Sequence, residues 1–113
     1  MGGIILHFFV HYFIDSNIKK PRKVIEKLSQ FKLLKTYYLV CFINGSDRLE
    51  IISTLLFKEK YFKEQSYEIV ALVKSQDTAF EFIRQLSEVS VRKYGDFCAR
   101  KCLQEIEDGE IDI

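Results

Sequence analysis

Residues 36–57 read TYYLVCFINGSDRLEIISTLLF, and this stretch decides the fold. Residues 36–43 are almost entirely aromatic, β-branched or aliphatic, which is typical of a buried strand. Asn44 and Gly45, followed by Ser46 and Asp47, predict a tight turn, because asparagine and glycine adopt the positive φ angles that hairpin turns require. Residues 49–57 are again apolar. The stretch therefore predicts a β-hairpin whose second strand runs over 49–57.

Two further apolar segments flank this hairpin. Residues 67–73, YEIVALV, predict a third strand, and the short connection before it favours an antiparallel meander. Residues 4–14, IILHFFVHYFI, predict a strand at the other end of the chain. A short buried helix is the alternative there, because a continuous apolar run fits both structures.

Three segments have helical patterns. Pro21 suits the first turn of a helix, and apolar residues recur at helical spacing through residues 21–33. A helix is also predicted over 78–94, with Thr78 and Glu81 as a capping box and Gly95 as its left-handed end. A last short helix is expected over 97–106.

The resulting order, β-α-β-β-β-α-α, predicts the α+β class. We expect a two-layer sandwich in which helices pack on one face of a three- to four-stranded, mainly antiparallel sheet. The length of 113 residues fits one domain, which we place at residues 1–106. Residues 107–113 are acidic and are expected to form a C-terminal tail.

All three central strands are apolar on both faces, so both faces of the predicted sheet need cover. If two helices cover one face, either residues 97–106 or a second subunit must cover the other. We therefore expect a small non-catalytic module that self-associates through its sheet as a homodimer, with another protein as a possible partner. The expected interface residues, on an arbitrary choice of face, are Tyr38, Val40, Ile52, Leu56 and Leu72.

The formal net charge is only +1, but residues 19–35 hold seven basic residues and one acid, Glu26. A helix with such a face neutralises phosphates, so the alternative function is nucleic-acid binding. The opposing interpretation is an ordinary solvated helix face, with the acidic tail as a second, intramolecular partner. The expected phosphate contacts are Lys19, Lys20, Arg22, Lys23, Lys27 and Lys32.

The remaining candidates for chemistry are two pairs spaced four residues apart. His7 and His11 lie on one side of either a helix or a strand, and Cys98 and Cys102 lie on one side of a helix. Neither pair has a recognisable third ligand or a nucleophile–base partner, so we assign no catalytic, metal or cofactor residue. An enzyme is the third interpretation and would need a cleft that unites distant groups.

Cysteine use and hydropathy bear on location. Three cysteines are an odd number, which favours reduced thiols and a cytoplasmic protein over a secreted disulfide scaffold. The apolar run at 4–14 is 11 residues long, against ~20 for a spanning helix, so we expect no membrane partner.

Overall fold

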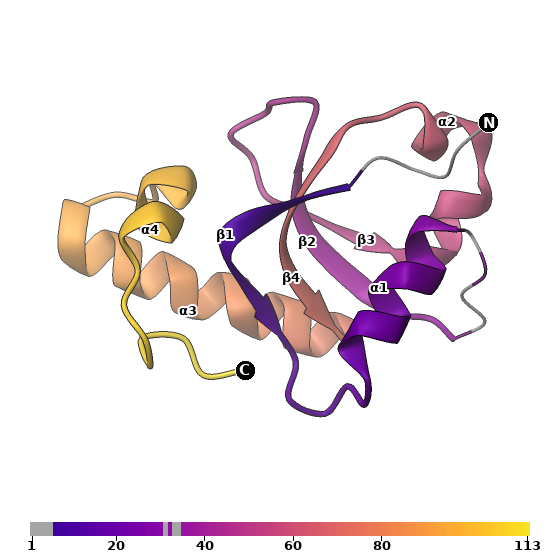
Figure 1. The fold of residues 1–113 in the computed structure, drawn as a ribbon. Coiled ribbons are helices and arrows are strands. Elements are labelled where there is room, and N and C mark those ends of the chain that lie inside the picture. Colours follow the sequence, from indigo (N-terminus) through magenta and orange to yellow (C-terminus); the bar gives the residue numbers. More distant parts are fainter. Residues whose placement is uncertain (1–5, 31, 33–34) are drawn as a thin grey trace.

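The computed structural model describes residues 6–30, 32 and 35–113, apart from the side chains of Val10 and His11. Four strands form one sheet in the order β1-β4-β2-β3 (Figure 1). The strands are β1 (Leu6–Ile14), β2 (Tyr38–Ile43), β3 (Glu50–Ser53) and β4 (Tyr67–Val73). The helices are α1 (Pro21–Ser29), the 3-10 helix η1 (Thr54–Lys58), α2 (Lys60–Lys63), α3 (Gln76–Tyr94) and α4 (Ala99–Glu105). The predicted α+β class is confirmed, and the strand predicted over 4–14 is confirmed for residues 6–14; residues 4 and 5 lie outside the described residues.

The sheet is mixed, and it is not a meander. β4 lies between β1 and β2, so the third predicted strand pairs with the first strand of the hairpin and not with the second. β4 runs antiparallel to β2 and parallel to β1. Burial explains the order: all of β4 except Glu68 is buried, as a central strand requires, whereas only Ile52 of β3 is buried.

The predicted second hairpin strand is half as long as expected. After Ser53 the chain leaves the sheet and coils into η1. Two hydroxyls stabilise this change: the Thr54 side chain accepts the Tyr37 N–H at 2.9 Å, and the Ser53 side chain accepts the Leu55 N–H at 3.3 Å. Phe57 is only 1% exposed, so η1 folds this aromatic ring into the core. Apolar composition does not distinguish such a coil from a strand.

The turn at Asn44 and Gly45 and the helix end at Gly95 are confirmed. Asn44 and Gly45 have φ angles of 53° and 75°, and Gly95 has φ 76° where α3 ends. The start of α3 differs from the capping box expected at Thr78. Ser75 caps the helix by accepting the Thr78 N–H, so the helix begins two residues earlier than predicted.

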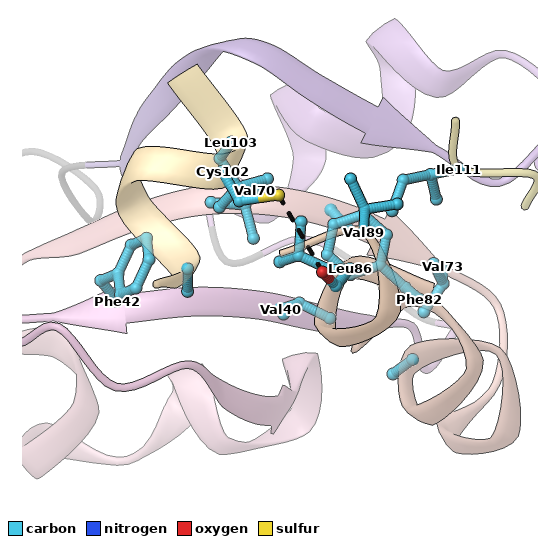
Figure 2. Packing of buried hydrophobic residues seen from close by; sticks show 13 residues of the cluster. Val40, Phe42, Val70, Val73, Phe82, Leu86, Val89, Cys102, Leu103 and Ile111 are labelled. Carbon is cyan, nitrogen blue, oxygen red and sulfur yellow. Dashed lines mark hydrogen bonds between the residues drawn. The ribbon is translucent and has the colours of Figure 1, made fainter. Parts of the chain in front are cut away.

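The helices cover both faces of the sheet, which corrects the prediction that they pack on one face. Figure 1 shows α3 and α4 on one side of the sheet and α1 on the other. Each side has its own apolar cluster. In Figure 2, Phe82, Leu86 and Leu103 of the two C-terminal helices pack against Val40 and Val70. The second cluster joins the α1 residues and η1 to the opposite sheet face, with Val24, Leu28, Leu39, Cys41, Phe57, Ile69 and Leu72 among its members.

The C-terminal segment is packed on α3 and is not a free tail. Ile111 is 7% exposed and belongs to the cluster under α3 and α4. Glu110 pairs with Lys93 at 2.8 Å, and the Asp112 N–H donates to Gln85 Oε1 at 2.7 Å. The acidic segment therefore binds α3, and it does not pair with the basic residues at 19–35.

Candidate nucleic-acid interface

Three segments that are distant in sequence meet at one edge of the sheet. β1 and β4 are parallel, so their carboxyl ends reach the same edge, where Ile14 pairs with Leu72. β2 runs antiparallel to β4 and begins there, with Tyr38 opposite Val73. The loop from β1 to α1, the residues before β2 and the junction from β4 to α3 therefore lie together. Ligands bind preferentially beyond the carboxyl ends of parallel strands in open sheets.

The loop from β1 to α1 turns sharply at Lys20. Its backbone is left-handed, with φ 53° and ψ 59°, and Pro21 follows as the first residue of α1. Proline at this position needs no N–H partner and presets the helical φ angle. The Lys23 N–H donates to the Lys20 carbonyl at 3.0 Å, which closes the first turn of α1. This turn places lysines both on the loop and along α1.

Two adjoining hollows lie along this edge and share Lys19, Lys35 and Tyr37. The first has a volume of about 240 Å³ and the second about 360 Å³. The first is also lined by Asn17, Ile18, Thr36 and Lys74, and the second by Lys20, Lys23, Val24 and Lys27. We call the two hollows together the lysine groove, after its six lysines: Lys19, Lys20, Lys23, Lys27, Lys35 and Lys74.

No carboxylate lines either hollow, and none of the six ammonium groups forms an ion pair with a described residue. Glu26 and Asp77 are exposed acids close along the chain that line neither hollow, and the third nearby acid, Asp15, is 3% exposed. Its two carboxylate oxygens accept the backbone N–H groups of Asn17 and Lys74, at 2.9 and 3.1 Å. Six positive charges therefore face solvent around one concave surface without neutralisation. Such a surface attracts anions strongly, because its walls concentrate the field.

The structure brings together four of the six predicted phosphate contacts. Lys19, Lys20, Lys23 and Lys27 line the lysine groove, whereas Arg22 and Lys32 are exposed but line neither hollow. The prediction did not include Lys35 and Lys74 as contacts. Lys35 was visible as part of the basic stretch. Lys74 had no signal in the sequence, because only the parallel pairing of β1 with β4 brings it to this edge.

The predicted sheet interface does not exist as one surface. Val40, Ile52 and Leu72 are at most 4% exposed within a single chain. Val40 lies in the cluster under α3 and α4, whereas Ile52 and Leu72 lie in the cluster under α1. Tyr38 and Leu56 are partly buried against opposite clusters as well. Leu39 is paired with both Ile52 and Leu72, so these two side chains lie on the face of Leu39 and not on the face of Tyr38 and Val40.

Among the described residues, the fold brings no further metal ligand to His7, Cys98 or Cys102. His7 is exposed on β1, and the side chain of His11 lies outside the described residues. Cys102 is fully buried and donates its thiol to the Leu86 carbonyl, as Figure 2 shows, and burial raises its pKa. Burial also raises the pKa of Cys41 to about 12. Within the part of the chain that the structure describes, no three His, Cys, Asp or Glu side chains are placed to hold a metal ion.

Comparison with known proteins gives no family assignment. No protein-family model, curated protein or solved structure matches this chain significantly. Among the described residues, no helix is both long and apolar enough to cross a membrane. The chemistry of the lysine groove is therefore the remaining guide to function.

Proposed function

We propose that this domain binds the phosphate backbone of nucleic acid in the lysine groove. The observation that supports this proposal is the convergence of six unpaired lysines, from three separate segments, on a concave surface that no carboxylate lines. An ordinary solvated helix face would carry its lysines along one helix alone. Here Lys35 and Lys74 come from segments other than the loop and α1, so an extended anion would meet positive charge from three parts of the chain.

Lysine is suited to this role because its ammonium group is a compact point charge on a flexible stem. A phosphate chain that enters the lysine groove releases its condensed counterions, which makes binding favourable at low salt. Among the described residues of the lining, Tyr37 is the only aromatic one; it is 8% exposed and offers little surface for base stacking. Phosphate contacts alone carry no sequence information. We therefore expect binding that depends on salt and is nearly independent of base sequence.

Substitution of two lysines on α1 tests the proposal. A fluorescein-labelled single-stranded oligonucleotide of mixed sequence is titrated with protein, and the Kd is measured by fluorescence anisotropy at about 0.1 M salt. For the double variant Lys23→Gln/Lys27→Gln we expect Kd to rise by roughly tenfold, because two phosphate contacts and their released counterions are lost.

The matched control removes two positive charges from other surfaces. In Arg48→Gln/Lys101→Gln, one exposed residue lies in the turn from β2 to β3 and the other on α4, across the sheet from α1. We expect the Kd of this variant to change by less than twofold. Equal losses in both double variants would show that only net charge matters and would contradict the proposed site. Displacement of the oligonucleotide by an equal charge concentration of polyglutamate would also contradict it, because the site would then bind acidic polypeptide.

Self-association remains a second candidate function. It would use the outermost strand β1 and not the two faces of the sheet. β1 pairs with β4 alone among the described strands, and its Tyr12 is 40% exposed and packs against Phe8 with ring centroids 4.9 Å apart. An apolar edge strand of nine residues is a template for pairing with another strand. Light scattering after size-exclusion chromatography tests it: a mass near 27 kDa, twice 13.4 kDa, would support a dimer, and a mass near 13.4 kDa would exclude one.

A further inference from the structure

Asp15 is a buried acid at the edge of the sheet where the lysine groove lies. Its own N–H donates to the Leu72 carbonyl at 2.9 Å, which ties the end of β1 to the end of β4. A buried carboxylate is costly unless polar groups satisfy it, and here two backbone N–H groups do so. No described ammonium group pairs with it.

The two N–H donors of Asp15 belong to two different segments that line the lysine groove. Asn17 lies on the loop that continues to Lys19, and the Ile18 N–H donates to the Asp15 carbonyl at 3.0 Å. Lys74 lies 59 residues from Asp15 in the sequence and lines the same hollow as Asn17 and Lys19. One side chain therefore links the segment that carries Lys19 to the segment that carries Lys74.

We propose that Asp15 is a positioning residue for anion binding, which holds Lys19 and Lys74 at the separation that lets one phosphate chain contact both. This inference rests on the proposed function. The inference gives Asp15 a role in binding although its negative charge repels the phosphates of the ligand. The proposal therefore makes a prediction opposite in sign to that of simple electrostatics.

The variant Asp15→Asn separates the two effects. It keeps the size of the side chain, removes the negative charge and leaves one oxygen to accept a bond where there were two. Charge alone would strengthen oligonucleotide binding. Loss of positioning should weaken it, and we expect Kd to rise about fivefold. We also expect the slope of log Kd against log salt to decrease by about 0.7, the value of one lost phosphate contact on a single strand.

A double-mutant cycle with Lys74→Gln tests whether Asp15 acts through the position of Lys74. Once Lys74 has lost its charge, its position no longer matters. We therefore expect Asp15→Asn to weaken binding in the wild-type background and to have no weakening effect in the Lys74→Gln background. A Kd for folded Asp15→Asn that is equal to or lower than the wild-type value would overturn the inference, as would the same fold-increase in both backgrounds.

Thermal unfolding shows whether each variant is folded. If Asp15→Asn does not fold, a measurement on the wild-type protein tests the same inference. In ¹H–¹⁵N spectra we expect the amide signals of Asn17 and Lys74 to shift together when unlabelled oligonucleotide is added. Unchanged amides in a protein that binds would overturn the inference alone. Absence of binding by the wild-type protein, or full binding by Lys23→Gln/Lys27→Gln, would instead overturn the proposed function.

Discussion

Lys20 is a residue whose backbone is strained at the proposed site. Its φ of 53° lies in the left-handed region, which costs a residue with a Cβ roughly 1–2 kcal/mol. The residue before a proline has further restrictions on its conformation. Glycine would adopt the same angles without this cost. Strained backbone tends to be retained where function requires it, and here the strain places a lysine at the mouth of the lysine groove.

The substitution Lys20→Gly should therefore separate stability from binding. We expect the free energy of unfolding to rise by about 0.5–1 kcal/mol, because relief of strain outweighs the entropy that glycine loses on folding. We expect the Kd for a single-stranded oligonucleotide to rise at the same time, because one ammonium group is lost. Urea denaturation and fluorescence anisotropy measure the two effects.

Lys19→Gly is the matched control for this prediction. It removes a neighbouring lysine whose φ is not positive, so we expect weaker binding together with lower stability. If Lys20→Gly destabilised the protein as much as Lys19→Gly does, the argument from strain would be wrong.

At the scale of elements, one arginine joins α4 to the sheet. Arg100 donates two hydrogen bonds to the Glu68 carboxylate on β4, at 2.7 and 2.9 Å. It also donates to Asp47 and to the Ser46 carbonyl in the turn from β2 to β3, and it lies 4.2 Å from the centre of the Phe42 ring. The hydrogen bonds to Arg100 lower the pKa of Glu68. A short helix is thereby fixed over the apolar cluster beneath it.

Removal of this arginine should have a cost that depends on pH. For Arg100→Ala we expect a loss of about 2 kcal/mol in the free energy of unfolding at pH 7, from several charge-assisted bonds. A carboxylate with a lowered folded-state pKa stabilises the fold above its unfolded-state pKa and loses this contribution as pH falls through the folded-state pKa. The difference between wild type and Arg100→Ala should therefore shrink as pH falls below about 4.5, the ordinary pKa of glutamate.

Urea denaturation at a series of pH values from 7 to 3 measures this difference. Arg84→Ala serves as the control, because Arg84 also contacts two carboxylates, Glu81 and Glu88, but does so on the exposed surface of α3 alone. Exposed pairs contribute less than about 1 kcal/mol. A difference for Arg100→Ala that stayed constant down to pH 3 would contradict the role given to Glu68.

At the scale of the whole molecule, local signals predicted the strands β1, β2 and β4 and the helices α1, α3 and α4, whereas η1 and α2 were not predicted and long-range pairing decided the arrangement. Turn residues such as Asn44 and Gly95 act through their own backbone angles, so the sequence predicts their positions. The place of β4 between β1 and β2 depends on which strands can be buried on both sides, and no local pattern specifies it. The assignment of helices to faces was wrong for the same reason.

The proposed site likewise has one part that the local sequence predicts and one part that depends on long-range strand pairing. The lysines of the loop and of α1 were visible as a charged stretch, whereas Lys74, and with it the contact between Lys74 and Asp15, reaches this site only through the pairing of β1 with β4. The two covered faces of the sheet also remove the reason for expecting a dimer built on a face. The positive charge of the lysine groove, and not an exposed apolar surface, becomes the leading indication of function.

The most direct test of the account is the salt dependence of single-stranded oligonucleotide binding by the wild-type protein. Kd is measured by anisotropy from about 0.05 to 0.3 M salt, with oligonucleotides of two unrelated sequences. If four to six lysines contact phosphates, log Kd should rise with log salt with a slope of roughly 3–4, and it should do so equally for both sequences. No binding at 0.05 M salt, or a Kd that salt does not change, would contradict the central claim.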